Sequence, residues 1–339
     1  MLSSFPASSA DAILAADGRL AHCSSCPRAC GADRRSGAAG RCGAGASAEV
    51  ASVCLHRGEE PAVSGPGGIA NVFFAGCNLG CSYCQNWQIS RPKGTVPLAV
   101  RGTVPFASLD AVAGEVLALL EAGASAVGFV STAHVIPQVE ALARALRARG
   151  ASAPFVFNTN GYESPESLDG VLGLMDVCLP DFKYSDPELA ARLSGARDYP
   201  SVALDALRRI FARTGPELVL DDAGVARRGL IVRHLVLPGR VENSLQCLRL
   251  IARELSPAVW LSLMSQYQPT PAVSGDPDLG RRLRPEEYQA VLDEADRLGF
   301  ENGWRQELAS AADWNPDFDR EEPFRDEDGE PQMDTDAHR

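Results

Sequence analysis

Three cysteines in the first third of the chain have a spacing that suits an iron–sulfur cluster. They form a Cys-x3-Cys-x2-Cys pattern, Cys77, Cys81 and Cys84, directly after a short apolar run. Three thiolates can hold three irons of a four-iron cluster, whereas a closed structural metal site uses four protein ligands. One corner of the cluster would then stay open and could bind a chelating small molecule. The alternative is a zinc site that borrows a fourth ligand, but zinc motifs usually contain paired cysteines.

Four more cysteines near the N-terminus form a second group: Cys23, Cys26, Cys30 and Cys42. Four thiols are the right number for a closed tetrahedral site, and we favour a bound metal. Zinc, a second iron–sulfur cluster and unliganded thiols are the three alternatives. A second cluster could relay electrons, whereas zinc could only hold the segment together. Cys54 is a spare ligand, and Cys178 and Cys247 are expected to be buried apolar residues.

Charged residues lie at the ends of predicted strands, where parallel α/β proteins form their sites. Asp181 and Lys183 are two residues apart in extended chain, so they share a face and could pair or both meet a ligand. A surface salt bridge is the alternative. Arg233 and His234 are adjacent within one strand, so at most one of them points into a barrel. Arg233 suits a carboxylate ligand, and His234 suits a proton carrier or a helix cap.

Uncharged polar residues and one further histidine occupy similar positions. Asn158 and Asn160 could hydrogen-bond a ligand or simply form a turn before a glycine. His134 has a loop position suited to substrate contact. Gln266 and Tyr267 follow the last predicted strand and are candidates for the substrate side, with ordinary packing as the alternative.

The elements that must position these residues alternate along the chain. Short apolar runs predict six strands, and longer amphipathic stretches predict helices between them. This alternation implies a parallel sheet, which could be doubly wound or a partly closed barrel. A hairpin is expected before the fifth strand, from residues 217–222 and 225–229. The predicted strands are 71–75, 126–130, 154–158, 176–180, 230–237 and 258–264, and the predicted helices are 106–121, 137–149, 165–174, 187–193, 201–212, 244–255 and 285–298.

Charge and composition limit the possible functions. The 339-residue chain has a net charge of −12, and residues 313–339 hold 11 acidic and 3 basic side chains. This balance argues against sequence-independent binding of nucleic acid. The pattern of a secretory signal and an apolar window long enough for a membrane helix are both missing, so we expect a cytoplasmic protein with reduced thiols. We predict a Cys-rich extension at 1–65, a core domain at 66–305 and a disordered acidic tail at 306–339.

The cysteine triplet, which follows a strand and has an aromatic residue before its third cysteine, resembles the signature of the radical S-adenosylmethionine (SAM) superfamily. By that resemblance the triplet binds a [4Fe-4S] cluster whose open iron takes the amino and carboxylate groups of SAM, with Tyr83 near the adenine. Reductive cleavage of SAM would give methionine and a 5′-deoxyadenosyl radical that removes a hydrogen atom from a substrate. The resemblance also implies a partial (β/α)6 barrel.

Within this superfamily, the chain is similar to pyruvate formate-lyase activating enzyme-like proteins. In activases, the loop after the second strand is Gly-rich with an acidic end that grips the SAM amino group. Here it reads Ser131-Thr132-Ala133-His134, so backbone carbonyls would accept from the ammonium instead. The N-terminal cysteine group is a second departure. The similarity covers nearly the whole chain and includes residues 26–30, 58–61, 64–65, 73–79, 84–86, 229–239, 266–269 and 299–304.

The resemblance implies a radical enzyme with an electron donor such as a flavodoxin or ferredoxin. Its first expected target is a glycyl radical enzyme. Modification of a peptide, RNA or small molecule is a rival, and a non-catalytic iron–sulfur or zinc protein is another. Residues expected on the substrate side are His134, Gln266 and Tyr267. Residues expected to contact SAM are Tyr83, Ser131, Thr132, Asn158, Asn160, Asp181, Lys183 and Arg233.

Overall fold

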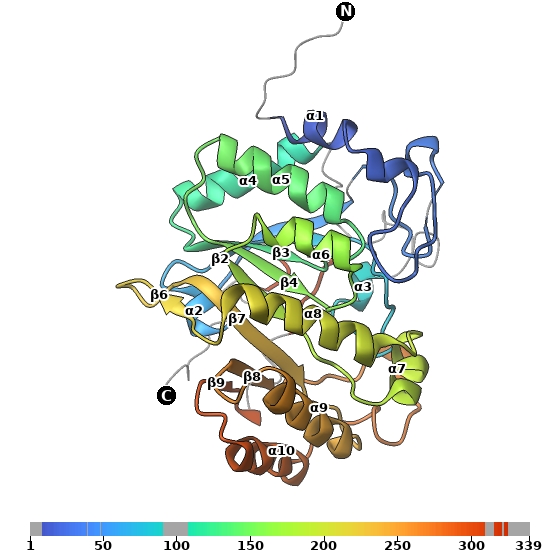
Figure 1. The fold of residues 1–339 in the computed structure, drawn as a ribbon, viewed down its shortest axis with the longest axis vertical. Coiled ribbons are helices and arrows are strands. Elements are labelled where there is room, and N and C mark those ends of the chain that lie inside the picture. Colours follow the sequence, from blue (N-terminus) through green and yellow to red (C-terminus); the bar gives the residue numbers. More distant parts are fainter. Residues whose placement is uncertain are drawn as a thin grey trace, which may run out of the picture.

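Parallel strands form the centre of the fold (Figure 1). The computed structural model describes residues 9–38, 40–47, 49–90, 108–308, 315–320 and 322–324. Each of the six predicted apolar runs is confirmed as a strand, with ends displaced by a few residues. The strands are β2 Ile69–Phe74, β3 Ala126–Val130, β4 Phe155–Thr159, β5 Val177–Pro180, β7 Ala226–Leu235 and β8 Trp260–Met264.

The order of these strands decides between the two architectures that the sequence left open. A doubly wound sheet reverses its strand order at a switch point. Here the order β1-β2-β3-β4-β5-β7-β8-β9 follows the chain without a reversal. Right-handed connections then place successive helices on the same side of the sheet. The fold is therefore the expected partial (β/α)6 barrel, with an outer face covered by helices and an inner face.

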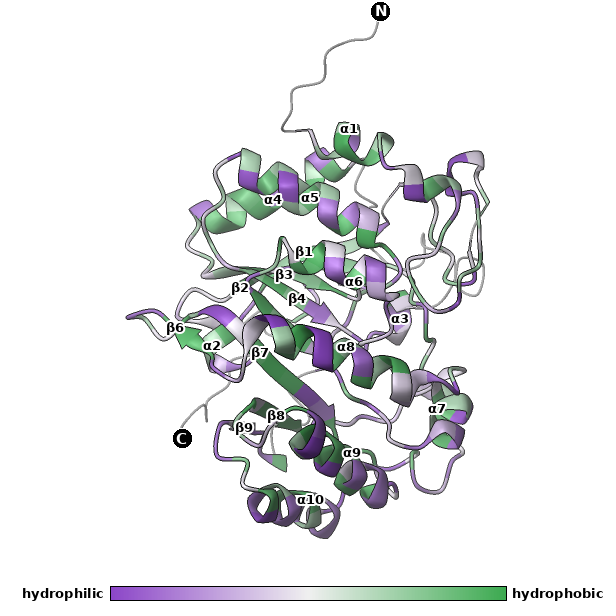
Figure 2. Cartoon of the chain, viewed as in Figure 1, coloured by the Kyte–Doolittle hydropathy of each residue, from purple (hydrophilic) through white to green (hydrophobic). Residues whose placement is uncertain are grey.

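Amphipathic helices cover the outer face, and Figure 2 shows their hydrophobic sides turned toward the sheet. Val72 and Phe74, alternate residues of β2, share a buried cluster with Val112 and Val116 of α4. Burial of each such side chain contributes about 1.5–3 kcal/mol. The predicted helix at 106–121 starts outside the described residues. The helices are α4 Leu109–Glu121, α5 Ile136–Ala148, α6 Pro165–Leu172, α7 Pro187–Ser194, α8 Tyr199–Thr214, α9 Val241–Glu254 and α10 Pro285–Leu298.

Additional strands extend the sheet at its ends. β1 (Val50–His56) pairs antiparallel with β2, so part of the N-terminal extension continues the sheet. β9 (Gly303–Arg305) pairs parallel with β8. The predicted hairpin is confirmed, because β6 (Val219–Leu220) pairs antiparallel with the start of β7. The short elements are α1 Ala10–Ala15, α2 Pro61–Ser64, α3 Trp87–Ser90 and the 3₁₀ turns η1 Gly18–Ala21, η2 Arg34–Ser36 and η4 Pro271–Val273.

The acidic tail was predicted to be disordered, but part of it is packed against the barrel. Its described residues are 306–308, 315–320 and 322–324. Phe318 is fully buried with Phe73 of β2 and Ile89 of α3. The Phe324 ring lies 5.6 Å from the Phe73 ring, centroid to centroid. Because Phe73 alternates with Val72 and Phe74, it points to the inner face of the barrel. The tail was predicted to be disordered from its charge, but its two phenylalanines pack against this inner face.

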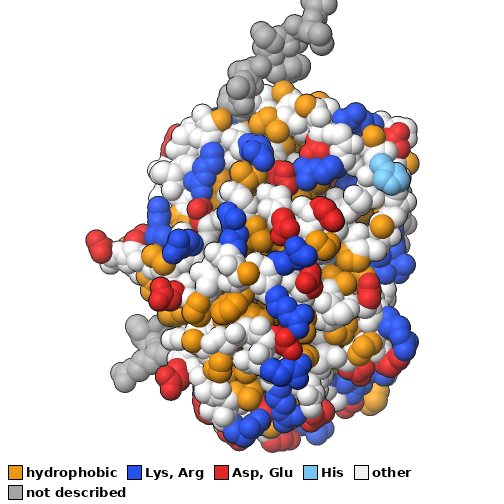
Figure 3. Space-filling view, viewed as in Figure 1, with side chains coloured by type: hydrophobic (Ala, Val, Ile, Leu, Met, Phe, Trp, Pro, Cys, Tyr) orange, Lys and Arg blue, Asp and Glu red, His pale blue; other side chains and the backbone are white. Residues whose placement is uncertain are grey.

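Basic and acidic side chains are interspersed on the face shown in Figure 3. Among the described residues, no helix combines the length and the apolar character needed to span a bilayer.

We predict that Phe318→Ala weakens the fold by about 2 kcal/mol, because a fully buried phenylalanine loses its apolar contacts. Urea denaturation would measure this loss. Phe318→Leu keeps most of the apolar surface and should cost about 1 kcal/mol. Equal unfolding free energies for Phe318→Ala and the wild type would show that the tail does not dock in solution.

Candidate functional site

The loop that carries the cysteine triplet begins at the carboxyl end of β2. The backbone N–H of Gly76 donates to the Ile89 carbonyl (2.8 Å), which closes the base of the loop. Gly76 has a φ of +87°, and a Cβ there would lie 2.8 Å from the Cys42 carbonyl oxygen. Glycine is needed here for both its conformation and its size. Ser82 anchors the top of the loop, because its N–H donates to the Leu193 carbonyl (2.8 Å).

Polar groups surround the sulfurs of the triplet. The Leu79 N–H lies 3.4 Å from the Cys77 sulfur, and the Ser194 hydroxyl donates to the Cys81 sulfur (2.9 Å). The Asn86 backbone and the Ser90 side chain lie near the Cys84 sulfur. Donors of this kind stabilise thiolates and tune the metal that they hold.

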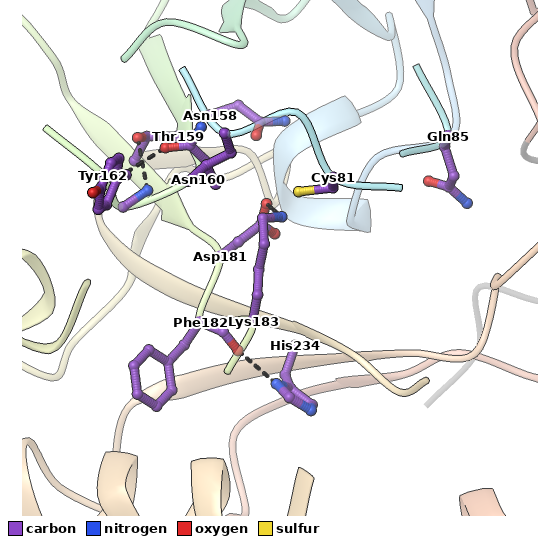
Figure 4. Close-up of polar contacts among 12 residues, drawn as sticks. Cys81, Gln85, Asn158, Thr159, Asn160, Tyr162, Asp181, Phe182, Lys183 and His234 are labelled. Carbon is purple, nitrogen blue, oxygen red and sulfur yellow. Dashed lines mark hydrogen bonds and ion pairs between the residues drawn. The ribbon is translucent and has the colours of Figure 1, made fainter. Parts of the chain in front are cut away.

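Lys183 and Asp181 lie beside this loop, as the sequence suggested for two residues that share a face. Their side chains form an ion pair, and the Lys183 ammonium extends toward Cys81 (Figure 4). Burial disfavours the ammonium, but Asp181 and the thiols of Cys81 and Cys84 outweigh it and hold the pKa of Lys183 above its ordinary value. A positive charge is thus maintained next to two of the three sulfurs.

The turn after β4 supports the other side of the loop. The Asn160 amide donates to Asn78 Oδ1 (2.9 Å) and lies 3.6 Å from the Cys77 sulfur. Asn78 in turn donates to the Tyr162 carbonyl (2.7 Å). Asn158 lies near the end of β4, on the side of the cysteine loop in Figure 4. The structure therefore brings both predicted asparagines to the triplet.

The loop after β3 lies under the cysteine loop. Ser131 adopts a left-handed conformation with a φ of +61°, which is unusual for a residue with a side chain. Thr132 is fully buried, and its hydroxyl lies 3.5 Å from the Asn158 carbonyl. His134 is also buried and donates through Nε2 to the Ala75 carbonyl (2.8 Å). Burial lowers the pKa of His134 to about 4, so it is neutral and fixes the end of β2.

Arg233 and His234 point in opposite directions, as adjacent strand residues must. The Arg233 guanidinium forms ion pairs with Glu59 and Glu60, and its Nε donates to Glu60 (2.8 Å). His234 points outward, donating to the Phe182 carbonyl (2.6 Å) and accepting from Ser244 (2.8 Å) (Figure 4). Burial lowers the pKa of His234 to about 4. Its position is that of a structural link rather than of a proton carrier.

Residues after β8 reach the loop through amide contacts. Gln85 donates to the Gln266 carbonyl (2.8 Å), and Gln306 donates to Gln266 Oε1 (2.8 Å). Tyr267 is buried and donates to the Leu279 carbonyl (2.6 Å). Its ring lies 6.2 Å from the ring of Tyr83, which is itself buried. Both tyrosines therefore belong to the aromatic packing beneath the loop.

The N-terminal cysteine group lies against the same loop. Arg28 Nε donates to the Asn78 carbonyl (3.1 Å), and the Cys42 carbonyl oxygen packs against Gly76. Figure 1 shows these blue loops beside α6, where the Ser164 N–H donates to the Ser25 carbonyl (3.0 Å). The two cysteine groups, separate in the sequence, are thus neighbours in space.

Sequence comparison identifies the family. The model of the radical SAM superfamily matches residues 71–244, slightly more than half of the chain. The chain belongs to the radical SAM superfamily. Strands β3 to β7, most of β2 and the cysteine triplet lie within the matched residues.

Two individual proteins are similar to this radical SAM protein. The uncharacterized protein MJ0674 of Methanocaldococcus jannaschii is 29% identical over 254 residues, which are 73% of this chain and 67% of the relative. The solved structure of native anSMEcpe with bound AdoMet is 14% identical with a TM-score of 0.41. That match covers 71% of this chain and 60% of the other, so the chain spans less than two thirds of that protein.

Membership in the superfamily implies a [4Fe-4S] cluster and SAM, and the triplet fits such a cluster. Burial raises the pKa of the Cys81 thiol to about 12, so bound iron is needed to keep the sulfur deprotonated at neutral pH. Within the described residues, no three His, Cys, Asp or Glu side chains are placed to hold one metal ion. A four-iron cluster binds each cysteine through a different iron, so its ligands need not converge on one point.

Several residues that support this site were not identified as site residues from the sequence. Asn78 and Gln85 lie within the cysteine loop, and their position there was the available signal. Ser194 and Gln306 contact the loop only through the tertiary fold. No local pattern marked them.

We predict that Gly76→Ala impairs both folding and cluster assembly, because its Cβ would meet the Cys42 carbonyl and the His134 ring. Gly80→Ala is the matched control, since Gly80 also has a positive φ of +80° but open space around its Cβ. Gly76→Ala should lose about 1–3 kcal/mol more unfolding free energy than Gly80→Ala, and bind less iron on anaerobic reconstitution. Equal losses for the two variants would refute the steric argument.

Proposed function

We propose that this radical SAM protein is an enzyme that cleaves SAM reductively and removes a hydrogen atom from a substrate. The observation that carries the proposal is the triplet of Cys77, Cys81 and Cys84 on the loop after β2, within the residues matched to the superfamily. When bound, the reduced cluster and SAM would supply a 5′-deoxyadenosyl radical for hydrogen abstraction. A flavodoxin or ferredoxin is the proposed electron donor.

The surrounding residues have proposed roles in holding SAM. We assign Lys183 to the SAM carboxylate, because its ammonium lies beside the triplet. Arg233 is less suited to this role, since Glu59 and Glu60 already hold its guanidinium. The carbonyls of the Ser131 loop are proposed to accept from the ammonium of SAM, and the Asn158 amide is proposed to hydrogen-bond its polar groups. The buried ring of Tyr83 supports the loop from below.

Loss of any one cysteine of the triplet should stop SAM cleavage. Cys77→Ala, Cys81→Ala and Cys84→Ala should each abolish 5′-deoxyadenosine formation from SAM with dithionite, because a cluster that lacks one thiolate is not held in place. Cys247→Ala is the matched control. Cys247 is buried in α9 away from the loop, and its variant should keep the wild-type rate.

Product formation is measured by chromatography of anaerobic reactions after reconstitution with iron and sulfide. Retained 5′-deoxyadenosine formation in all three loop variants would refute the assignment of the triplet. Loss of activity in the Cys247→Ala control as well would show that the effect is not specific to the loop.

For the substrate, we propose a glycine in the backbone of a partner glycyl radical enzyme. Similarity of the residues around the triplet to activase-like proteins supports this choice. A second support is that the inner face of the barrel accommodates polypeptide, since Phe318 packs there and its N–H donates to Gln88 Oε1 (3.0 Å). The alternatives are modification of a separate peptide, an RNA or a small molecule.

Incubation with each glycyl radical enzyme encoded in the same genome tests this substrate. The expected result is a protein radical detected by electron paramagnetic resonance, together with one 5′-deoxyadenosine per radical formed. Replacement of the reactive glycine of the partner by alanine should remove the signal. SAM cleavage without a protein radical for every such partner would contradict activation and favour the alternatives.

A further inference from the structure

The cysteines of the N-terminal thiol group, Cys23, Cys26, Cys30 and Cys42, lie close together on one folded segment. The chain doubles back here, because the Cys23 N–H donates to the Ala32 carbonyl and the Gly31 N–H donates to the Cys23 carbonyl. Arg34 Nη2 lies 3.0 Å from the Cys23 sulfur and 3.7 Å from the Cys42 sulfur. A Cβ on Gly40 would lie 3.0 Å from the Cys30 sulfur and 3.7 Å from the Cys42 sulfur.

The backbone around these thiols resembles that around the loop triplet. In the triplet, the Leu79 N–H donates to the Cys77 sulfur (3.4 Å), and the Asn86 N–H lies near the Cys84 sulfur. In the N-terminal thiol group, the backbone N–H two positions later likewise lies near the sulfur: Arg28 for Cys26, Ala32 for Cys30 and Ala44 for Cys42. Backbone N–H groups around sulfur are a feature of iron–sulfur sites.

The three isolated cysteines provide an internal comparison. Cys54 contacts the Ser52 side chain, and Cys247 contacts the Ser185 side chain. The pKa of Cys178 is raised by burial, and charged side chains are the other groups that affect it. The backbone donors are therefore found in the two cysteine groups and not around these buried thiols.

A buried arginine in the group requires negative charge nearby. Arg34 is 3% exposed, and within the described part of the chain it forms no ion pair with a carboxylate. Its guanidinium donates instead to the His134 carbonyl (2.9 Å) and to the sulfurs of Cys23 and Cys42. A buried charge without a partner is costly, and a metal centre whose sulfur ligands bring net negative charge would supply that partner beside Arg34.

The kind of metal centre follows from the geometry and the location. No three of these thiols are arranged around a single ion, which disfavours zinc. The group also contacts the loop of the triplet directly, because Arg28 Nε donates to the Asn78 carbonyl (3.1 Å) and the Cys42 carbonyl oxygen packs against Gly76, the residue before Cys77. The two cysteine groups are therefore neighbours.

We propose that Cys23, Cys26, Cys30 and Cys42 bind a second [4Fe-4S] cluster that passes electrons to the cluster of the loop triplet. The electron-transfer role of this second cluster rests on the proposed function, whereas its binding by the four N-terminal cysteines does not. A one-electron protein donor is oxidised as it reduces the N-terminal cluster from the 2+ to the 1+ state. That cluster returns to 2+ as it gives the electron to the catalytic cluster, one electron for each SAM cleaved.

The surface around the N-terminal group suits such a donor. Cys30 and Arg41 are exposed, and Arg35 is exposed nearby. Residues 23–47 contain four arginines and one aspartate, although the whole chain has a net charge of −12. A donor with an acidic surface, as flavodoxins and ferredoxins have, would be steered to this region.

Iron analysis of a triple variant tests the binding site independently of SAM chemistry. Cys77→Ala/Cys81→Ala/Cys84→Ala removes the catalytic cluster, so any iron that remains is held elsewhere. After anaerobic reconstitution, this variant should contain about four irons and four sulfides per chain, against about eight of each in the wild type. Its reduced electron paramagnetic resonance signal should not change when SAM is added.

A complementary variant tests electron transfer. Cys26→Ser/Cys30→Ser should keep about four irons, a SAM-sensitive signal and dithionite-driven SAM cleavage. With reduced flavodoxin as the donor, its rate should fall about tenfold or more. Cys247→Ala should match the wild type with both reductants.

These measurements separate failure of the second cluster from failure of the proposed function. A triple variant with no iron, or with one zinc per chain, would overturn the second cluster. Equal flavodoxin-driven rates in Cys26→Ser/Cys30→Ser and the wild type would overturn its role in electron transfer. The wild type could also cleave no SAM while the triple variant still holds four irons. That result would support the second cluster and contradict the enzymatic function.

Discussion

The hydrogen bonds of one buried residue, Asn78, hold the reactive part of this protein together. Its amide donates to the Tyr162 carbonyl, its Oδ1 accepts from Asn160, and its carbonyl accepts from Arg28. These bonds join the cysteine loop to the turn after β4 and to the N-terminal loops. A buried amide that loses a partner costs about 1–3 kcal/mol, so the three segments are fixed together rather than separately. The positions of the sulfurs depend on this junction.

Charges and aromatic rings occupy the inner face of the barrel. Arg233 extends from β7 to Glu59 and Glu60. Burial alone would raise the pKa of Glu59, but the neighbouring Arg233 charge outweighs burial and holds that pKa below its ordinary value. Such a pair stabilises little overall, but removing one partner would leave a buried charge unpaired. Phe318 and Phe324 cover the adjacent part of β2. The inner face is therefore shaped by long-range pairs between residues far apart in the sequence.

The sequence was sufficient for the six parallel strands from β2 to β8 and for the triplet, but not for the added strands β1 and β9 or for side-chain partners. Apolar runs and helical spacing are local signals, and they located β2 to β8 because each such element buries its own residues. The prediction of a disordered tail was wrong around Phe318, because it relied on the many acidic residues of the segment. A single buried aromatic ring is enough to fix such a segment, and composition does not reveal it. Alternation predicted that Arg233 and His234 face opposite ways. Only the fold shows that Arg233 meets two glutamates and that His134 is buried under the loop.

The cysteine loop separates two sides with different chemistry. On one side Asn78 meets the N-terminal thiol group, whose exposed edge carries arginines. On the other side the loop continues into α3, where Gln88 and Ile89 contact the tail segment around Phe318. An electron arriving through the N-terminal group would reach the triplet without crossing the inner face. A polypeptide substrate approaching along that face would instead have to displace Phe318. Electron delivery therefore depends on the N-terminal loops, whereas substrate access depends on the tail segment.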